Sequence, residues 1–497
     1  MHAYSYCKAF GYGEWNDGVN AIIFTALCLF PINTFRFHML FYVEFVKVTP
    51  WYIFALMILE RWIEQVFGFY IQRYENRPLR SLCSASIDGR APTRGKRMTE
   101  KAQSAPQSQI SFLLFLVLGA IGALTPLAID MYLPAMPTIA KDLGVAPGAV
   151  QITLTAYTAG FAIGQLIHGP LADSFGRRPV LILGVLFFGL AAVVSATTNG
   201  IDALTYVRTA QGFAGAAAAV IIQAVVRDMF DREDFARAMS FVTLVITIAP
   251  LVAPMIGGHL AIWFGWRSIF WVLAIFAVVV IFLVLWKIPE TLQPENRQPL
   301  RFRTTLRNYA RLCSNPEAIG LMLSGAFSFS GMFAFLTAGS FVYIDLYGVR
   351  PDHFGYLFGL NIVAMIIMTS INGRLVKKVG SHAMLRFGLF VQLLAGIGLF
   401  VSWLMDFGLW GIVPFVVLFI GTLSTIGSNA MALLLSGYPS MAGTASSLAG
   451  TLRFGIGSLV GALVASLPGN VAWPMIIVMF ACSVLSALFY WTLGRKA

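Results

Sequence analysis

Long apolar runs separated by short polar connections dominate the chain from Ser111 onward. A helix needs about 20 apolar residues to cross the hydrocarbon core of a bilayer. Twelve runs of this kind follow one another, at 111–133, 148–168, 179–197, 203–225, 238–262, 268–286, 317–344, 354–372, 387–405, 408–435, 443–467 and 471–493. The pattern predicts an all-α membrane protein with twelve transmembrane helices.

Composition supports the same class of protein. Of the 497 residues, 58% are hydrophobic and 11% are charged, whereas about a quarter are charged in soluble domains. The five cysteines have neither the spacing of a zinc site nor that of a disulfide framework. Because the basic residues lie in loops beside the spans, we attribute the net charge of +12 to orientation in the bilayer rather than to nucleic-acid binding.

The distribution of Lys and Arg predicts that orientation, because basic residues near span ends stay in the cytoplasm. Connections after odd-numbered spans hold three, Lys141, Arg267 and Arg350. Connections after even-numbered spans, together with the C-terminal tail, hold seventeen: Arg177, Arg178, Arg227, Arg232, Arg237, Lys287, Arg297, Arg301, Arg303, Arg307, Arg311, Arg374, Lys377, Lys378, Arg386, Arg495 and Lys496. We therefore expect both ends of the twelve-span core to be cytoplasmic.

A polar connection at 290–316 divides the spans into two sets of six. We expect one six-helix bundle over 98–289 and a second over 317–497. Arg303, Arg307 and Arg311 recur every four residues in the connection, which places them on one face of a helix. That stripe fits contact with anionic lipid headgroups and fits a solvated loop equally well, so both interpretations stay open.

Residues 1–97 do not follow this plan. Arg36, Glu44 and Glu60 interrupt their apolar stretches, and no signal-peptide pattern is visible. We expect translation to start at Met98, because residues 98–109 read as a short polar tail before a first span. One or two additional amphipathic or membrane helices are the alternative.

The loop between the second and third spans reads Gly-Pro-Leu-Ala-Asp-Ser-Phe-Gly-Arg-Arg-Pro at 169–179. Gly169 and Gly176 permit a tight turn between close-packed helices. Asp173, Arg177 and Arg178 can bond to one another and to helix ends, so we expect a cytoplasmic gate here.

A degenerate copy of this loop occupies 373–380, at an offset of 373 − 169 = 204 residues. The copy predicts two halves related by duplication. Lys377 stands at the position equivalent to Asp173. Because the second half lacks the acid, we expect an asymmetric gate in which Asp173 matters more.

Three strongly charged residues lie within the spans: Asp130, Arg208 and Arg453. Each costs about 2.5–3.5 kcal/mol at the centre of an inserted helix, so each needs a partner or water. Burial favours the protonated form of a carboxyl group, which suits a proton carrier. Asp130 either carries protons or caps a wetted helix end, and Arg208 either tunes a nearby acid or forms a structural ion pair.

The fifth span contains two prolines and a glycine pair, Pro250, Pro254, Gly257 and Gly258. Proline removes a backbone hydrogen bond and favours a kink. Glycine allows neighbouring helices to approach closely. We expect a kinked helix that packs tightly against its neighbours.

Taken together, these motifs resemble those of the major facilitator superfamily. The loop at 169–179 resembles the superfamily's signature, and Arg208–Gly212 resembles the Arg-x-x-Gln-Gly motif of its proton-coupled members. The run at 249–258 resembles the antiporter motif of its drug exporters, with alanine at two glycine positions. With the runs at 129–134 and 443–457, the chain resembles the Bcr/CflA drug-resistance branch over about residues 110–495.

The resemblance implies the major facilitator fold and proton-coupled efflux of small drug-like compounds, such as bicyclomycin and sulfonamides, by alternating access. It implies that Asp130 and Arg208 couple protons, and that Asp173 and Arg177 lock the cytoplasmic side in the outward-facing state. It implies a monomer in the bacterial inner membrane, with a small-molecule substrate, protons and lipid as partners and with no cofactor, metal or nucleic acid. An exporter of a metabolite such as cysteine or short peptides, and a proton-coupled uptake permease, are the alternatives.

A carrier of this kind needs a cavity between its halves that is lined by few polar groups. Any single tyrosine or asparagine more often forms an interhelical hydrogen bond than a substrate contact. The chain has no Gly-x-x-x-x-Gly-Lys-Ser/Thr loop, and His168 and His259 are isolated, which disfavours an ATP-driven pump and an enzyme. The candidate substrate-binding residues are Asp130, Tyr132, Tyr157, Arg208, Tyr343, Asn361, Asn429 and Arg453.

Overall fold

A computed structural model describes residues 112–497 apart from 231, 298–301, 439–440, 470 and 495–497. The predicted start at Met98, and the alternative of extra helices within 1–97, lie outside the described residues. In the described part, twelve helices are long and apolar enough to cross a membrane. The predicted all-α membrane fold is confirmed.

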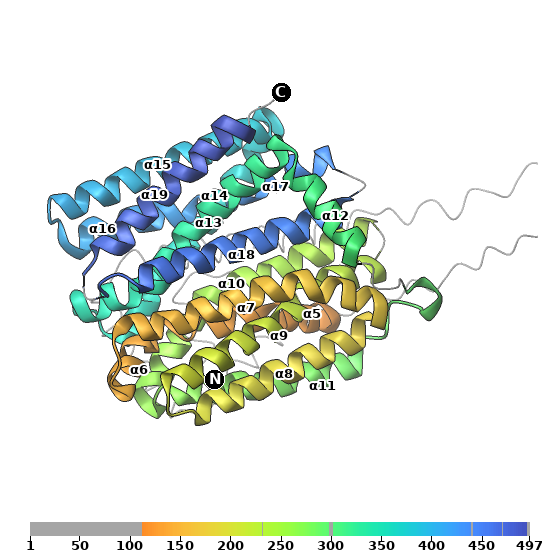
Figure 1. The fold of residues 1–497 in the computed structure, drawn as a ribbon, viewed down its shortest axis with the longest axis horizontal. Coiled ribbons are helices and arrows are strands. Elements are labelled where there is room, and N and C mark those ends of the chain that lie inside the picture. Colours follow the sequence, from red (N-terminus) through yellow and green to blue (C-terminus); the bar gives the residue numbers. More distant parts are fainter. Residues whose placement is uncertain (1–111, 231, 298–301, 439–440, 470, 495–497) are drawn as a thin grey trace, which may run out of the picture. The chain divides into compact units, whose positions relative to one another are not determined.

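The first six spans run from α5 to α11 (Figure 1). The first span is interrupted, because α5 ends at Asp130 and a 3₁₀ turn containing Pro134 leads into the short α6. Proline has no backbone N–H for a continuing helix. The helices of this half are α5 Phe112–Asp130, α6 Met136–Leu143, α7 Pro147–Phe175, α8 Arg177–Thr197, α9 Ile201–Met229, α10 Arg232–Phe264 and α11 Arg267–Lys287.

The second six spans run from α13 to α19. Two of them, α13 and α19, continue into π-helical segments at Phe341–Leu346 and Tyr490–Gly494. The apolar run predicted at 408–435 is two helices, α16 and α17, which meet at Thr422. The helices are α13 Pro316–Ser340, α14 Pro351–Val379, α15 Ser381–Leu404, α16 Gly408–Gly421, α17 Leu423–Gly437, α18 Ala442–Ala465 and α19 Trp473–Phe489.

The two halves repeat at an offset of 204 residues. Adding 204 to the bounds of α7, Pro147–Phe175, gives 351–379, which are the bounds of α14. Adding 204 to the first residue of α8, Arg177, gives 381, which is the first residue of α15. The offset that the loop motif predicts is therefore the offset of the helices themselves.

Two equivalent helix pairs join the halves, α7 with α18, which lie side by side in Figure 1, and α10 with α14. Their backbones approach closely at one end, where a Cβ on Gly148 would overlap the carbonyl oxygen of Ala465 and one on Gly355 would lie 2.8 Å from the backbone nitrogen of Met255. Glycine is needed at both positions because a side chain would force the helices apart. We call this end the α6 end and the opposite end the α12 end.

The predicted surface helix in the connecting segment is present as α12, Phe302–Cys313. Its apolar face packs on the second half, where Leu312 is fully buried and the Tyr309 hydroxyl lies 3.3 Å from the Ser447 hydroxyl. Arg307 and Arg311 are exposed. This helix therefore separates an apolar face from a basic one, as its spacing predicts.

Candidate functional site

Arg208 is fully buried in α9 among the helices of the first half. Its guanidinium donates to the Gln211 side-chain oxygen at 2.7 Å and to the Ala128 carbonyl at 3.1 Å. Its central carbon lies 4.8 Å from the ring centre of Tyr132, 4.4 Å from that of Tyr157 and 5.7 Å from that of Phe270. We call Arg208, Gln211, Tyr132, Tyr157 and Phe270 the Arg208 cluster.

Threonines hold both tyrosines of the cluster in place. The Tyr132 hydroxyl lies 2.6 Å from that of Thr153, which in turn donates to the Val150 carbonyl at 2.7 Å. The Tyr157 hydroxyl donates to Thr125 at 3.4 Å. The cation therefore lies over two tyrosine rings whose hydroxyls bond to Thr153 of α7 and Thr125 of α5, and cation–π attraction is strongest when water is absent.

Asp130 is the last residue of α5, two residues before Tyr132, and its side chain is buried. Its carboxyl group forms no hydrogen bond or ion pair with any residue that the structure describes. A buried carboxyl without a partner favours its neutral, protonated form. The described structure thus brings Asp130 close in sequence to the Tyr132 of the Arg208 cluster without joining the acid and the arginine in an ion pair.

The glycines of α10 bring this helix against the first-half site and against the second half. A Cβ on Gly257 would overlap the carbonyl oxygen of Met131, the residue that follows Asp130. A Cβ on Gly258 would lie 2.7 Å from the carbonyl oxygen of Pro351, at the start of α14. Pro250 and Pro254 of the predicted kinked motif therefore lie inside one continuous helix, α10. The two glycines of the motif allow this helix to pack closely against both the first span and α14.

The second-half candidates do not join the Arg208 cluster. Tyr343 is buried among aromatic rings, 5.6 Å from Phe335 and 6.0 Å from Phe354 between ring centres. Asn361 is buried on α14, and its side-chain oxygen has no partner among the described residues. Asn429 donates to the Asn372 side-chain oxygen at 2.7 Å, which is an interhelical bond.

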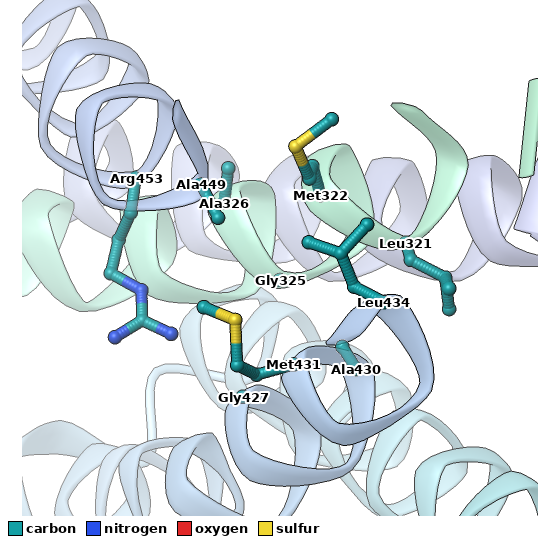
Figure 2. Close-up of a pocket in the computed structure, with 10 residues that line it drawn as sticks. All are labelled: Leu321, Met322, Gly325, Ala326, Gly427, Ala430, Met431, Leu434, Ala449 and Arg453. Carbon is teal, nitrogen blue, oxygen red and sulfur yellow. The ribbon is translucent and has the colours of Figure 1, made fainter. Parts of the chain in front are cut away.

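Arg453 lies in a pocket of its own between α13, α17 and α18 (Figure 2). The guanidinium carbon lies 5.1 Å from the ring centre of Phe329. The two membrane arginines therefore occupy separate sites, one in each half.

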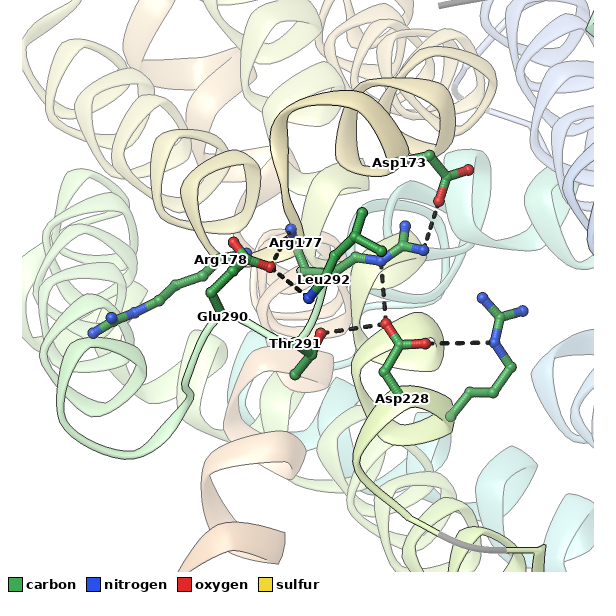
Figure 3. Close-up of polar contacts among 8 residues, drawn as sticks. Asp173, Arg177, Arg178, Asp228, Glu290, Thr291 and Leu292 are labelled. Carbon is green, nitrogen blue, oxygen red and sulfur yellow. Dashed lines mark hydrogen bonds and ion pairs between the residues drawn. The ribbon is translucent and has the colours of Figure 1, made fainter. Parts of the chain in front are cut away.

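The loop at 169–179 forms an ion-pair network within the first half (Figure 3). The Arg177 guanidinium lies 2.5 Å from the Asp173 carboxylate, and its Nε donates to the Asp228 carboxylate at 3.4 Å. The Thr291 hydroxyl donates to the same Asp228 carboxylate at 3.3 Å. The network ties the α7–α8 loop to the end of α9 and to the segment after α11.

Glu290 caps the start of α8 in this network. Its carboxylate accepts from the backbone N–H of Arg177 at 2.9 Å, from that of Arg178 at 3.2 Å and from that of Leu292 at 3.0 Å. Gly176 has φ 105°, and a Cβ there would lie 2.5 Å from a Glu290 oxygen. A carboxylate at a helix N-terminus satisfies unpaired N–H groups and complements the helix dipole.

Sequence reasoning missed Asp228 and Glu290. Both residues flank spans at the same end as Asp173. This shared position is the signal in the sequence that could have pointed to them. In the second half, Lys377 and Lys378 are exposed and form no ion pair within the described chain. Among the described residues, no three His, Cys, Asp or Glu side chains are grouped so as to hold a metal ion.

The family model described as Major Facilitator Superfamily matches residues 118–462. The chain belongs to the major facilitator superfamily. Its members are transporters, so this chain is a multi-pass membrane transporter of small molecules and not an enzyme.

Within the superfamily, the chain is 46% identical over 390 residues to the "Bicyclomycin resistance protein homolog" of Haemophilus influenzae, a match that covers 78% of this chain and 98% of the relative. It is 29% identical over 401 residues to "Multidrug resistance protein D" of Escherichia coli, covering 78% and 97% of the two chains. The predicted resemblance to the drug-resistance branch is confirmed.

Solved structures of superfamily members share the fold. The crystal structure of a D-xylose–proton symporter matches with a TM-score of 0.63 and 19% identity, covering 78% of this chain and 99% of that one. The inward-open xylose transporter XylE from E. coli matches with a TM-score of 0.62 and 16% identity, covering 78% and 97%. At these identities the likeness concerns the fold alone.

Proposed function

We propose that this transporter exports small drug-like compounds in exchange for protons by alternating access. The observation that carries the proposal is the buried Asp130 carboxyl, which lies unpaired beside the Arg208 cluster in a membrane span. A charge at such a depth marks an ion or proton pathway by default. The 46% identity to a bicyclomycin resistance protein homolog supports drug-like cargo.

Contacts between the halves at the α6 end support alternating access. Lys141 and Asp345 form an ion pair of 2.9 Å there, and the Ser340 hydroxyl contacts the Met136 sulfur at 3.8 Å. Each pair joins residues that are 204 positions apart, so each joins equivalent positions of the two halves. We infer that this is the state closed at the α6 end.

The α12 end faces the cytoplasm in this proposal, which follows from the seventeen basic residues there against three at the other end. The protein lies in the bacterial inner membrane as a monomer, and the proton gradient replaces any cofactor. The state described is then inward-facing. In that state the ion pairs of Asp173 and Arg177 run to other first-half groups, and we propose that they hold the second half only in the outward-facing state.

Asp130 and Arg208 carry the proton coupling in this proposal. With the protein inward-facing, the carboxyl group releases its proton to the cytoplasm as the substrate binds, and it takes up a proton from the opposite side after the substrate has left. The substrate contacts are proposed among the eight polar candidates, of which Asp130, Tyr132, Tyr157 and Arg208 gather at one site.

Everted membrane vesicles test the proposed function. Respiring vesicles acidify their lumen, and an added drug should evoke proton release that a pH-sensitive dye reports. Export that survives collapse of the gradient but stops when ATP is removed would refute proton antiport. Uptake that runs with the proton, or export of cysteine and short peptides without drug export, would support the alternative carriers instead.

A further inference from the structure

The turn between α14 and α15 is rich in cations and contains no acidic residue. Arg374, Lys377 and Lys378 lie in the last two turns of α14, and Arg386 lies in the second turn of α15. All four side chains are exposed, and none forms an ion pair with any residue that the structure describes. The Arg386 Nε donates at 3.4 Å to the carbonyl of His382 in its own helix. We call these four cations the 374–386 patch.

In the first half, carboxylates neutralise the equivalent turn. Asp173 pairs with Arg177, and Glu290 accepts from backbone N–H groups at the start of α8. Adding 204 to the numbers of these two acids gives Lys377 and Gly494. The second half therefore has a cation and a glycine where the first half has its anions.

The backbones of the two turns are alike, but their surroundings differ. Gly176 has φ 105°, and Gly380, which follows it by 204 residues, has φ 82°. A Cβ on Gly176 would lie 2.5 Å from a Glu290 oxygen, whereas one on Gly380 meets nothing within 4 Å. The space that a carboxylate fills beside the first turn is therefore open beside the second, among the residues that the structure describes.

The acids of the second half do not neutralise the patch. Residues 317–497 contain four, Glu317, Asp345, Asp352 and Asp406. Asp345 and Asp352 pair with cations at the α6 end, and Asp406 follows α15 at that same end. Glu317, in the first turn of α13, forms no ion pair within the described chain. The rule that basic residues stay in the cytoplasm accounts for cations at the α12 end but not for the loss of acids from one half alone.

An exposed apolar face begins at this patch and runs along α15. Its members, spaced three or four residues apart on one side of the helix, are Phe387, Phe390, Leu394, Ile397 and Val401. Arg386 precedes Phe390 by four residues, which places the cation on the same side. The face is about 21 Å long at 1.5 Å per residue. An acidic soluble protein at the patch would leave this face uncovered, whereas the acyl chains of a lipid cover it.

We propose that the 374–386 patch binds the phosphate headgroup of an anionic membrane lipid, whose acyl chains lie along the exposed face of α15. Clusters of four or more Lys and Arg beside the end of a membrane span attract anionic headgroups. The lipid phosphate supplies at the second turn the negative charge that Asp173 and Glu290 supply at the first. The inference goes beyond the proposed function, because it holds for any cargo and does not require proton exchange.

Binding of two matched lipids to the full chain tests the inference. The purified protein in detergent is titrated with dioleoylphosphatidylglycerol and with dioleoylphosphatidylcholine, which have the same acyl chains and differ in net charge. Native mass spectrometry reports the affinity of the first bound lipid. We expect the anionic lipid to bind at least tenfold more tightly, with a preference that shrinks as ionic strength rises, because salt screens exposed charges. Equal affinities for the two lipids would overturn the inference.

Paired variants assign the preference to the patch. Lys377→Gln with Lys378→Gln should weaken binding of the anionic lipid at least tenfold, since each such cation contributes about fivefold. The matched control, Arg227→Gln with Arg297→Gln, removes two exposed cations of the first half at the same end and should keep the preference within about twofold. Equal losses in both variants would assign the attraction to the overall charge, and the inference would fail. Thermal unfolding of each variant checks that it folds.

Glycerol 1-phosphate distinguishes a lipid headgroup from a free phosphate, because it carries the phosphate without acyl chains. We expect it not to bind at concentrations at which phosphatidylglycerol saturates the protein. Binding as tight as that of the lipid would assign the patch to a free phosphate and overturn the lipid partner. None of these measurements involves transport, so a failure of drug-evoked proton release would refute the proposed function and leave the lipid site standing.

Discussion

Lys141 and Asp345 form an ion pair of 2.9 Å between the two halves, and they occupy equivalent positions in the 204-residue repeat. A contact between equivalent residues lies on the pseudo-twofold axis that relates the halves. The same holds for Met136 and Ser340, which touch nearby. The two halves therefore meet at this axis at the α6 end, which is the contact that the proposed alternating access would have to open.

The ion pair predicts a shift in the balance between the two states. Lys141→Asp places two like charges together and should increase opening at the α6 end, by up to about fivefold in population, since exposed pairs contribute about 0.2–1 kcal/mol. Distances between spin labels on α6 and α14 measure the opening. The double variant Lys141→Asp with Asp345→Lys restores the pair and should restore closure. If the double variant opens as far as the single one, the pair does not control closure.

Substitution of Asp130 should abolish proton coupling while the protein still folds. Asp130→Asn keeps the size and polarity of the side chain but cannot release a proton, so drug-evoked proton release from everted vesicles should disappear. Asp202→Asn is the matched control, since Asp202 is an exposed acid in the first turn of α9. Proton release that persists at the wild-type rate in Asp130→Asn would remove this residue from the mechanism.

Gly257 predicts a packing defect beside the site. Gly257→Ala adds a methyl group that would overlap the carbonyl oxygen of Met131, and overpacking of this kind costs about 1–3 kcal/mol. The variant should unfold at a lower temperature in detergent. Gly373→Ala, where the added Cβ meets nothing within 4 Å, should leave the unfolding temperature within the error of the wild type. Equal effects of the two substitutions would contradict the close approach of α10 to α5.

We expect the start of α8, next to the 169–179 loop, to depend on Glu290, which lies outside that loop. Glu290→Ala leaves the N–H groups of Arg177 and Arg178 without their acceptor, and loss of a helix cap costs about 0.5–2 kcal/mol. Hydrogen exchange at the start of α8 should accelerate accordingly. Glu295→Ala is the control, because Glu295 is exposed in the same connection. Unchanged exchange in Glu290→Ala would show that α8 does not need this cap.

The sequence alone determines the twelve spans, the 204-residue repeat and the identity of the charged residues within the membrane. Each of these is local, because hydrophobic length, loop motifs and rare charges can be read within about 20 residues. Two breaks within the spans are not predicted by the apolar pattern. The break between α16 and α17 and the turn after Asp130 interrupt apolar runs that show no loss of hydrophobicity.

The tertiary structure alone decides which of these residues meet. Tyr132, Tyr157 and Arg208 come from three segments and share one site, whereas Arg453 lies in a pocket of the other half. Glu290 bonds to Arg177 at the α7–α8 loop although the two residues are more than 100 positions apart in the sequence. The hydrophobic pattern fixes how deep in the membrane a residue lies. The direction in which its side chain points depends on how its helix is rotated about its axis. That rotation is set by packing against helices that are distant in the sequence.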